Sequence, residues 1–188
     1  MLMKLLLASN SPRRRELLAL LDIDFEIIKP RDVDEIYPAD LPTADVAPYL
    51  SSLKANAYVG VPMQGEVLVT ADTVVICEGR ILGKPSDERE AIDMLAMLSG
   101  KTHEVVTGVT LMSPDKTVTF SETTNVTFDT LTPETIARYV DRYRPFDKAG
   151  AYGIQEWIGC IGISRIDGCY YNVMGLPLHA LYRHLSDF

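Results

Sequence analysis

A run of three arginines, Arg13–Arg15, opens a predicted helix near the start of this 188-residue chain. Before it, an apolar segment ends in a short polar turn, where Ser11 suits a helix N-cap and Pro12 suits the first helical position. Because a helix N-terminus already carries partial positive charge, cations there are unfavourable unless an anion binds above the turn. Guanidinium forks and free backbone N–H groups suit phosphate oxygens. The pattern indicates a polyphosphate site, and the alternative is a capped helix with a solvated basic patch.

Asp72 is the second candidate, because it interrupts an otherwise apolar run from Val67 to Ile76. A carboxylate in an apolar strand is costly unless it binds a metal, pairs with a cation or lies at an opening. Such a group could hold Mg²⁺ through oxygen or act as a general base on water. The alternative is an aspartate at a strand end that bonds to backbone.

Three further charged side chains could serve the same chemistry. Lys84 follows Gly83 on a stiff Gly-Lys-Pro turn and could hold a phosphate as a point charge. Lys54 lies beside the apolar face of a predicted helix, and Glu35 lies in an acidic, proline-containing loop at 30–42. That loop is longer than most connections, which is typical of functional or mobile segments. The alternatives are solvated lysines and a loop acid without a specific role.

The segment from Asp147 to Gln155 combines glycines and alanines with a charged pair, an aromatic residue and an amide. Small residues let a ligand approach the backbone closely. The Gln155 amide carries both a donor and an acceptor, so it could read the edge of a base. The alternative is a tight turn stabilised by an ion pair of Asp147 with Lys148.

Composition limits the classes of function. The chain has a net charge of −8 and 47% hydrophobic residues, which predicts a packed globular core and argues against binding long nucleic acid. We expect no membrane span, reduced thiols at its three cysteines, and a cytoplasmic location, because residues 1–7 are too short for a signal peptide. The sequence also lacks the HExxH, GxSxG and P-loop motifs.

Hydrophobic periodicity predicts a mixture of helices and strands. We expect helices at 11–21, 46–57, 87–98, 133–143 and 177–186. In the first of these helices, Leu17, Leu20 and Leu21 share the apolar face. In the second, Pro48 is tolerable only in the first turn. We expect strands at 3–8, 24–28, 66–77 and 80–82, an antiparallel hairpin of 102–112 with 117–131, and two short strands within 163–173. Repeats and clear linkers are absent, so the sequence predicts one domain, 1–188, with an α/β or α+β fold and a mixed sheet.

Taken together, the motifs resemble the Maf family. The similar blocks are Leu-Ala-Ser-Asn-Ser-Pro-Arg-Arg-Arg at 7–15, Val-Asp-Glu at 33–35, Leu50 with Lys54-Ala55, Ala-Asp-Thr at 71–73, Gly-Lys-Pro at 83–85, Leu-Ser-Gly at 98–100, Asp-Lys-Ala-Gly-Ala-Tyr-Gly-Ile-Gln at 147–155 and Gly-Leu-Pro-Leu at 175–178. They follow the family's order over nearly the whole chain. Asn10 and Ser51 are small departures from the family's usual residues.

The resemblance implies a nucleoside triphosphate pyrophosphatase, which cleaves between the α and β phosphates with a divalent metal, Mg²⁺ or Mn²⁺. It implies an elongated mixed sheet flanked by helices, with two lobes around a central cleft, as in Maf and ITPase-like folds. Asp72 would be the general base and would hold the metal together with Glu35. The residues that would bind the phosphates are Ser9, Arg14, Lys54 and Lys84, and Asp147 and Lys148 are further active-site candidates.

Three positions separate subgroups of the family. Arg13, Thr73 and Gln155 are similar to the subgroup that acts on dTTP and UTP, whereas the 7-methyl-GTP subgroup has Trp, Gln and Glu there. The resemblance therefore implies a small nucleotide as partner, a link to excluding non-standard nucleotides and to cell division, and a homodimer as in many family members. The alternatives are a nucleotide-binding regulator of septum formation without turnover and a pyrophosphatase for 7-methyl-GTP.

Overall fold

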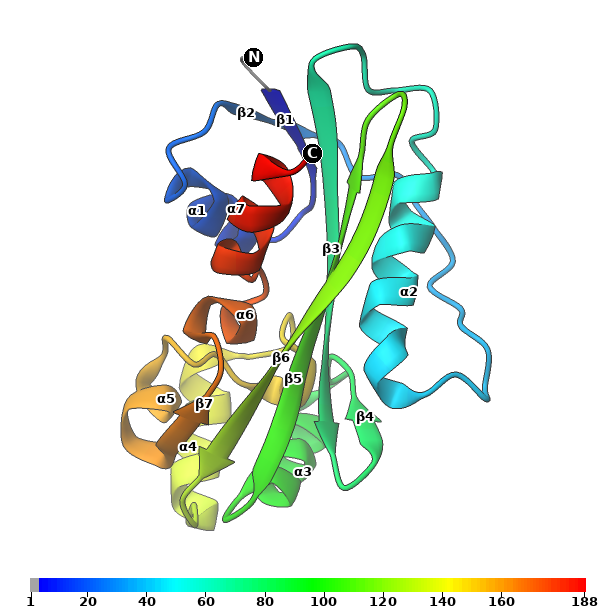
Figure 1. Ribbon diagram of the computed structural model, residues 1–188. Helices are drawn as coiled ribbons and strands as arrows, with labels where there is room; N and C mark the ends of the chain where they lie inside the picture. The colour runs from blue at the N-terminus through cyan, green and yellow to red at the C-terminus, as the bar shows by residue number, and fades with distance from the viewer. Residues whose placement is uncertain (1–3) are drawn as a thin grey trace. The chain divides into compact units, whose positions relative to one another are not determined.

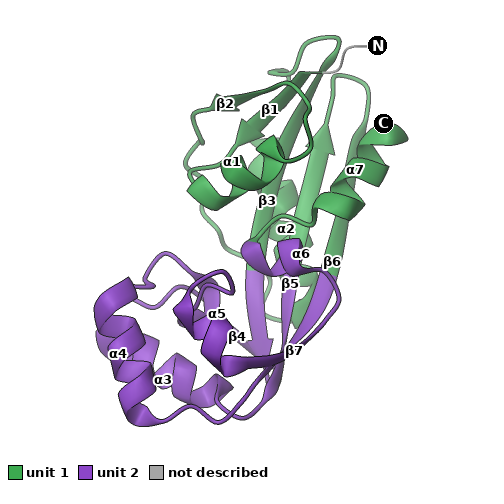
Figure 2. Ribbon diagram, turned by 90° about the vertical axis from the view of Figure 1, so that its left-hand side faces the viewer, with its two compact units in different colours: residues 1–73, 107–122, 175–188 green, residues 74–106, 123–174 purple. Residues whose placement is uncertain are grey.

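The computed structural model describes residues 4–188, and the chain divides into two compact units (Figure 2). Unit 1 contains the described residues up to Thr73 together with Thr107–Glu122 and Gly175–Phe188. Unit 2 contains Val74–Val106 and Thr123–Met174. The single domain and the central cleft stay predictions, and the predicted first strand begins at Met3, outside the described residues.

Across the described part of the chain, seven strands form one mixed sheet (Figure 1). Their order is β2-β1-β3-β5-β6-β7, and β4 also pairs with β3. The strands are β1 (Lys4–Ala8), β2 (Phe25–Ile28), β3 (Glu66–Cys77), β4 (Arg80–Leu82), β5 (Thr102–Met112), β6 (Thr117–Phe128) and β7 (Ile163–Asp167). This arrangement confirms the predicted α/β class with a mixed sheet flanked by helices.

In unit 1, strand β1 lies between β2 and β3 and pairs with both in parallel. Parallel strands are buried on both faces, which explains the unbroken apolar run of Leu5, Leu6 and Leu7. Helices α1 (Pro12–Ala19) and α7 (Leu178–Ser186) lie on one side of the sheet, and α2 (Thr43–Asn56) lies on the other (Figures 1 and 2). Leu6, Leu68 and Tyr58 belong to a small core in this unit.

Helix α2 comes unusually close to β5 at Gly108. A Cβ atom added to Gly108 would lie 2.2 Å from the Pro48 nitrogen and 2.3 Å from the Ala47 carbonyl carbon. The prediction that Pro48 would fit only a first turn is wrong, since Pro48 lies inside the helix. The Pro48 nitrogen, which carries no hydrogen, lies where the backbone of α2 contacts Gly108. The Ser51 hydroxyl donates to the Pro48 carbonyl at 2.8 Å.

Unit 2 has a larger core. Helices α3 (Glu88–Leu98) and α4 (Pro133–Tyr143) contact each other, and α3 also contacts the 3₁₀ turn η1 (Ala149–Ala151). Tyr139, Phe128 and Ile158 are among the fully buried side chains of this core. Asp87 caps α3 and Thr132 caps α4, each with its side chain accepting a backbone N–H.

Most of the predicted elements are confirmed to within a few residues. The hairpin is antiparallel, because the Thr110 hydroxyl meets that of Thr119 at 2.9 Å and the Thr102 hydroxyl meets that of Thr127 at 2.8 Å. The second short strand within 163–173 is wrong, because α6 (Tyr170–Met174) follows β7. The segment before β7, where no helix was predicted, contains α5 (Trp157–Gly162).

The apolar face predicted for α1 is also partly wrong. Leu17 and Leu18 are buried, whereas Leu20 is 63% exposed. Helix α1 ends at Ala19, so Leu20 lies beyond its last turn and leaves the periodic face. None of the described helices is long and apolar enough to cross a membrane. All three cysteines are free.

Candidate active site

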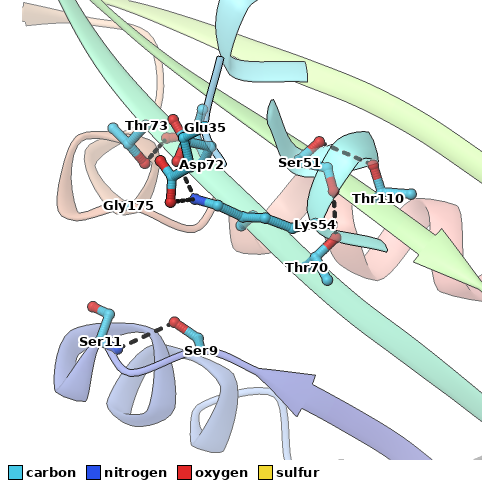
Figure 3. A network of polar contacts seen from close by, with 12 residues as sticks. Ser9, Ser11, Glu35, Ser51, Lys54, Thr70, Asp72, Thr73, Thr110 and Gly175 are labelled. Atoms are coloured by element: carbon cyan, nitrogen blue, oxygen red, sulfur yellow. Dashed lines mark hydrogen bonds and ion pairs between the residues drawn. The ribbon is translucent and has the colours of Figure 1, made fainter. Parts of the chain in front are cut away.

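The turn that leads into α1 has the predicted caps. The Ser11 side chain accepts from the Arg14 backbone N–H at 3.4 Å, and its own N–H donates to the Ser9 hydroxyl at 3.2 Å (Figure 3). Pro12 occupies the first helical position, and the first turn contains no acidic residue. The positive end of the helix is therefore not neutralised by its own side chains, as the sequence predicts for an anion site.

The Arg14 guanidinium donates hydrogen bonds to the residues on both sides of Asp72. It donates to the Ala71 carbonyl at 2.8 Å, to the Thr73 hydroxyl at 3.1 Å and, through Nε, to the Gly175 carbonyl at 2.8 Å. Burial lowers the pKa of this guanidinium from its ordinary value, while the nearby Asp72 carboxylate acts in the opposite direction. The predicted phosphate contact of Arg14 stays a prediction, and its observed partners are protein acceptors.

Lys54 lies between two carboxylates (Figure 3). Its Nζ is 2.5 Å from Oδ1 of Asp72 and 3.0 Å from Oε1 of Glu35. The exposed fraction of the side chain is 13% for Asp72, 22% for Lys54 and 53% for Glu35. The structure therefore brings together three of the predicted residues from three segments: strand β3, helix α2 and the 30–42 loop.

Buried hydroxyl groups fix α2, which carries Lys54, against the sheet. The Thr70 hydroxyl donates to the Ser51 carbonyl at 2.7 Å, and the Ser51 hydroxyl meets that of Thr110 at 2.9 Å. Thr70 is two residues before Asp72 on β3, and Ser51 is three residues before Lys54 on α2. These bonds fix the position of α2 along β3, so that the Lys54 side chain reaches Asp72 (Figure 3).

Hydrogen bonds with Tyr58 hold the start of the loop that carries Glu35. The Tyr58 hydroxyl accepts from the Arg31 N–H at 2.7 Å and donates to the Lys29 carbonyl at 2.9 Å. The Arg31 guanidinium lies over the Tyr58 ring, with its carbon 4.9 Å from the ring centroid, and also donates to the Ala57 carbonyl. These contacts hold the loop against the end of α2 and leave Glu35 exposed toward Lys54.

The donor set suits a divalent cation only in combination with a substrate. Within residues 4–188, no group of three or more His, Cys, Asp or Glu side chains is arranged to hold a metal. Glu35 and Asp72 supply carboxylate oxygens a short distance from one shared cation, the Lys54 ammonium. Mg²⁺ is commonly held by one or two carboxylates together with substrate phosphates, so this pair fits such an ion.

Thr73, one of the predicted specificity residues, is engaged within the protein. Its hydroxyl accepts from Arg14 and meets the Thr107 hydroxyl at 2.9 Å. Thr107 is fully buried on β5. Sequence reasoning missed Thr107 and Gly175, because a buried threonine and a glycine carbonyl carry no signal of function in a single sequence. Arg13, the second specificity position, is partly buried in the first turn of α1.

The remaining candidates lie in unit 2. Lys84 and Gln155 are exposed, Asp147 is exposed, and Lys148 is buried. The Gly150 N–H donates to the Gly83 carbonyl at 3.1 Å, which ties the turn of Lys84 to the 147–155 segment. The Lys148 ammonium lies 2.7 Å from Asp147 and 3.2 Å from Glu156, so the predicted ion pair is present. A joint site of these residues with the Asp72 group stays a prediction.

The chain is similar to known proteins over nearly its whole length. The family model described as Maf-like protein matches residues 4–188. The dTTP/UTP pyrophosphatase of Porphyromonas gingivalis is 54% identical over 187 residues, which cover 98% of this chain and 94% of that protein. The dTTP/UTP pyrophosphatase of Bacteroides thetaiotaomicron is 50% identical over 183 residues, covering 97% and 95%.

A more distant relative, the dTTP/UTP pyrophosphatase of Flavobacterium psychrophilum, is 48% identical over 184 residues and covers 98% of this chain. Among solved structures, a HAM1 protein from Coxiella burnetii is 16% identical with a TM-score of 0.43, and it covers 67% of this chain and 73% of its own. The family model and the three relatives, which agree along the chain, show that it belongs to the family of Maf-like proteins.

Proposed function

We propose that this chain is a nucleoside triphosphate pyrophosphatase that hydrolyses dTTP and UTP to the monophosphate and pyrophosphate. The observation that carries the proposal is the group formed by Asp72, Lys54 and Glu35 beside the basic first turn of α1. It combines a partly exposed carboxylate with cationic groups, which is what hydrolysis of a polyphosphate needs. The relatives named dTTP/UTP pyrophosphatase support the choice of substrate.

The reaction breaks the bond between the α phosphorus and the oxygen that bridges it to the β phosphorus. Water attacks the α phosphorus, its proton goes to a base, and pyrophosphate leaves with the bridging oxygen. The main catalytic requirement is to neutralise phosphate charge and to stabilise the leaving group. Lys54, Lys84 and the N–H groups of the α1 turn serve this purpose in our proposal, with Ser9 and Arg14 at the same turn.

Asp72 is the proposed general base. In the structure its carboxylate is paired with the Lys54 ammonium. When a triphosphate binds, its oxygens compete for the ammonium of Lys54. Transfer of that ammonium from Asp72 to phosphate would free the carboxylate to take a proton from water just when substrate is present. Lys54 would thus couple substrate binding to activation of the base.

Glu35 and Asp72 are the residues that would hold a divalent cation, Mg²⁺ or Mn²⁺. When bound, the cation supplies positive charge against the phosphate oxygens. Arg13, Thr73 and Gln155 are the proposed determinants of pyrimidine specificity, with the Gln155 amide reading the base edge. Asp147 and Lys148 support the segment that carries Gln155. The homodimer, the cytoplasmic location and the link to cell division stay predictions.

The proposal is tested by pyrophosphate release from dTTP, UTP, CTP, GTP, ITP and 7-methyl-GTP, with Mg²⁺ or Mn²⁺. We expect dTTP and UTP to be turned over fastest. The variant Asp72→Asn should lose roughly 10²- to 10⁴-fold in kcat, which is the typical contribution of general-base catalysis. It should stay folded, since Lys54 keeps Glu35 as a partner. Asp141→Asn, an exposed aspartate on α4, is the matched control and should behave as the wild type.

The outcomes separate the parts of the proposal. Full activity in a folded Asp72→Asn protein would contradict the role of Asp72. Turnover of a purine triphosphate alone would retain the reaction and reject the specificity roles of Arg13, Thr73 and Gln155. Nucleotide binding without any turnover would favour the regulator of septum formation.

A further inference from the structure

In unit 2, the buried Tyr139 hydroxyl forms hydrogen bonds with both ends of the turn that carries Gln155. Tyr139 of α4 is fully buried, and its hydroxyl accepts from the Gly153 N–H at 3.0 Å. The same hydroxyl donates to Oε2 of Glu156. Burial raises the pKa of Tyr139, and the Glu156 carboxylate raises it further, so the hydroxyl keeps its proton and its donor role.

Gly153 and Glu156 are the first and last residues of one tight turn. The Glu156 N–H donates to the Gly153 carbonyl at 3.0 Å, so Ile154 and Gln155 are the two central residues. Ile154 is buried, whereas Gln155 is exposed. The turn therefore buries the Ile154 side chain in the core and leaves the Gln155 side chain exposed. The Tyr139 hydroxyl bonds to both end residues of the turn, Gly153 and Glu156.

Two further contacts restrain the Gly153–Glu156 turn, which together with Tyr139 and Lys148 forms what we call the platform of Gln155. The second carboxylate oxygen of Glu156 lies 3.2 Å from the ammonium of Lys148, whose side chain is 10% exposed. On the other side, the Gly159 N–H donates to the Glu156 carbonyl at 3.0 Å. A Cβ atom on Gly159 would lie 1.9 Å from the Ile154 carbonyl oxygen, so the first turn of α5 lies directly against the Gln155 turn.

We propose that Tyr139 is a positioning residue for base selection: its hydroxyl, with Glu156 and Lys148, fixes the Gly153–Glu156 turn so that the Gln155 amide reads a pyrimidine base. The inference rests on the proposed function and assigns to Tyr139 no contact with substrate. A glutamine side chain has several rotatable bonds, and a fixed backbone reduces the entropy that it loses on binding. Fixing the turn thus favours the base whose edge matches the amide.

Loss of the hydroxyl should change selectivity more than chemistry. In Tyr139→Phe the Gly153 N–H and the Glu156 carboxylate both lose a partner, and the turn gains freedom. The residues proposed to bind phosphate and activate water in unit 1 are untouched by the substitution. We therefore expect the ratio of kcat/KM for dTTP to that for GTP to fall by about tenfold, through a higher KM for dTTP, with little change in kcat.

The experiment measures kcat and KM for dTTP, UTP and GTP in the wild type, Tyr139→Phe, Gln155→Ala and the double variant. Tyr143→Phe is the matched control, because it removes the same group from the next turn of α4, where its ring stacks on Tyr139. Thermal unfolding checks that each variant is folded. Should Tyr139→Phe fail to fold, Glu156→Gln takes its place in the experiment, because this variant weakens the same platform.

The inference is supported if Tyr139→Phe and Gln155→Ala lose selectivity alike, the double variant loses no more than Gln155→Ala, and Tyr143→Phe keeps the wild-type ratio. It is overturned if folded Tyr139→Phe keeps that ratio while Gln155→Ala loses it. Unchanged selectivity in Gln155→Ala would also overturn it, although dTTP hydrolysis by the wild type would stand. If the wild type turned over no triphosphate, the proposed function would fail, and the same ratio taken from Kd values would decide the inference.

Discussion

Asp72 is held in place by two cations that act in different ways. Lys54 neutralises the carboxylate directly, at 2.5 Å. Arg14 does not touch it in the structure but bonds to the backbone carbonyl before it and to the hydroxyl after it. A planar guanidinium with five donors in fixed directions can hold several acceptors at once, which an ammonium cannot do in the same geometry. The position of Asp72 therefore depends on the shape of Arg14 as well as on its charge.

The substitution Arg14→Lys tests this dependence at the scale of a single residue. It keeps the charge but leaves at least one of the acceptors Ala71, Thr73 and Gly175 without its donor. Hydrogen bonds to charged groups contribute about 1.5–3 kcal/mol each, so we expect the free energy of unfolding to fall by about that amount. We also expect kcat/KM for dTTP to fall by roughly 10- to 100-fold, which steady-state kinetics and urea unfolding would measure.

Arg15→Lys is the matched control for that variant, since Arg15 is exposed one position later on the same helix. It should keep wild-type stability and activity. A fully active Arg14→Lys enzyme would show that positive charge alone is required at this position.

At the scale of elements, the site depends on how closely α2 approaches the sheet. Gly108 has no side chain, so the backbone of α2 at Ala47 and Pro48 can lie directly on β5. Lys54 is on the same helix, two turns further along, and its reach to Asp72 depends on that distance. Any group larger than hydrogen at 108 must push the helix away from the strand.

We therefore expect Gly108→Ala to reduce both stability and activity. Overpacking typically costs about 1–3 kcal/mol, and a displaced Lys54 would weaken phosphate binding and the coupling to Asp72. Urea unfolding and the KM for dTTP are the measurements. Gly83→Ala is the control for stability, because a Cβ atom there meets nothing within 4 Å. Wild-type stability in Gly108→Ala would mean that α2 can move without cost.

The elements themselves could largely be predicted from the sequence. Apolar runs marked the strands well, and the Ser11 cap followed by Pro12 marked the start of α1, because these signals are local. The predictions that failed have two different causes. Helices α5 and α6 have six and five residues, too short for helical periodicity to emerge. The close contact of Pro48 with Gly108 is a tertiary event that propensity does not contain.

The candidate site was predictable to the extent that it consists of charges in unusual places. Asp72 in an apolar strand and arginines at a helix start violate local rules, and such violations are expected at functional sites. Tyr139 and Thr107 follow the rules, as a buried aromatic residue and a buried strand threonine do. Their roles depend on which groups face their hydroxyls, and a single sequence does not record those neighbours.

At the scale of the whole molecule, the net charge of −8 contrasts with the basic turn of α1. A broadly acidic surface repels long polyanions, whereas a small triphosphate interacts mainly with nearby groups, because salt screens charges beyond about 10 Å. We therefore expect the chain to bind a small nucleotide at the basic turn and not to bind long nucleic acid.

Stability of the whole molecule should depend on pH through one buried histidine. His103 is 2% exposed on β5, its Nε2 lies 2.8 Å from the Tyr152 hydroxyl, and its ring stacks on Phe128. Burial lowers the pKa of His103 from 6.5 to about 4. Between these two values the unfolded chain binds a proton at this residue and the folded chain does not. Acid therefore favours unfolding within that window.

We expect His103 to contribute its full share of stability above pH 6.5, to lose it progressively as the pH falls toward 4, and to add no further loss below that. The total over this window is about 3 kcal/mol, since each pKa unit corresponds to about 1.4 kcal/mol. Urea unfolding between pH 7 and pH 4 would measure it. His103→Gln should have a flatter pH dependence than the wild type, whereas His179→Gln, which removes an exposed histidine, should not. Equal slopes in wild type and His103→Gln would mean that His103 takes up its proton as easily in the folded chain as in the unfolded one.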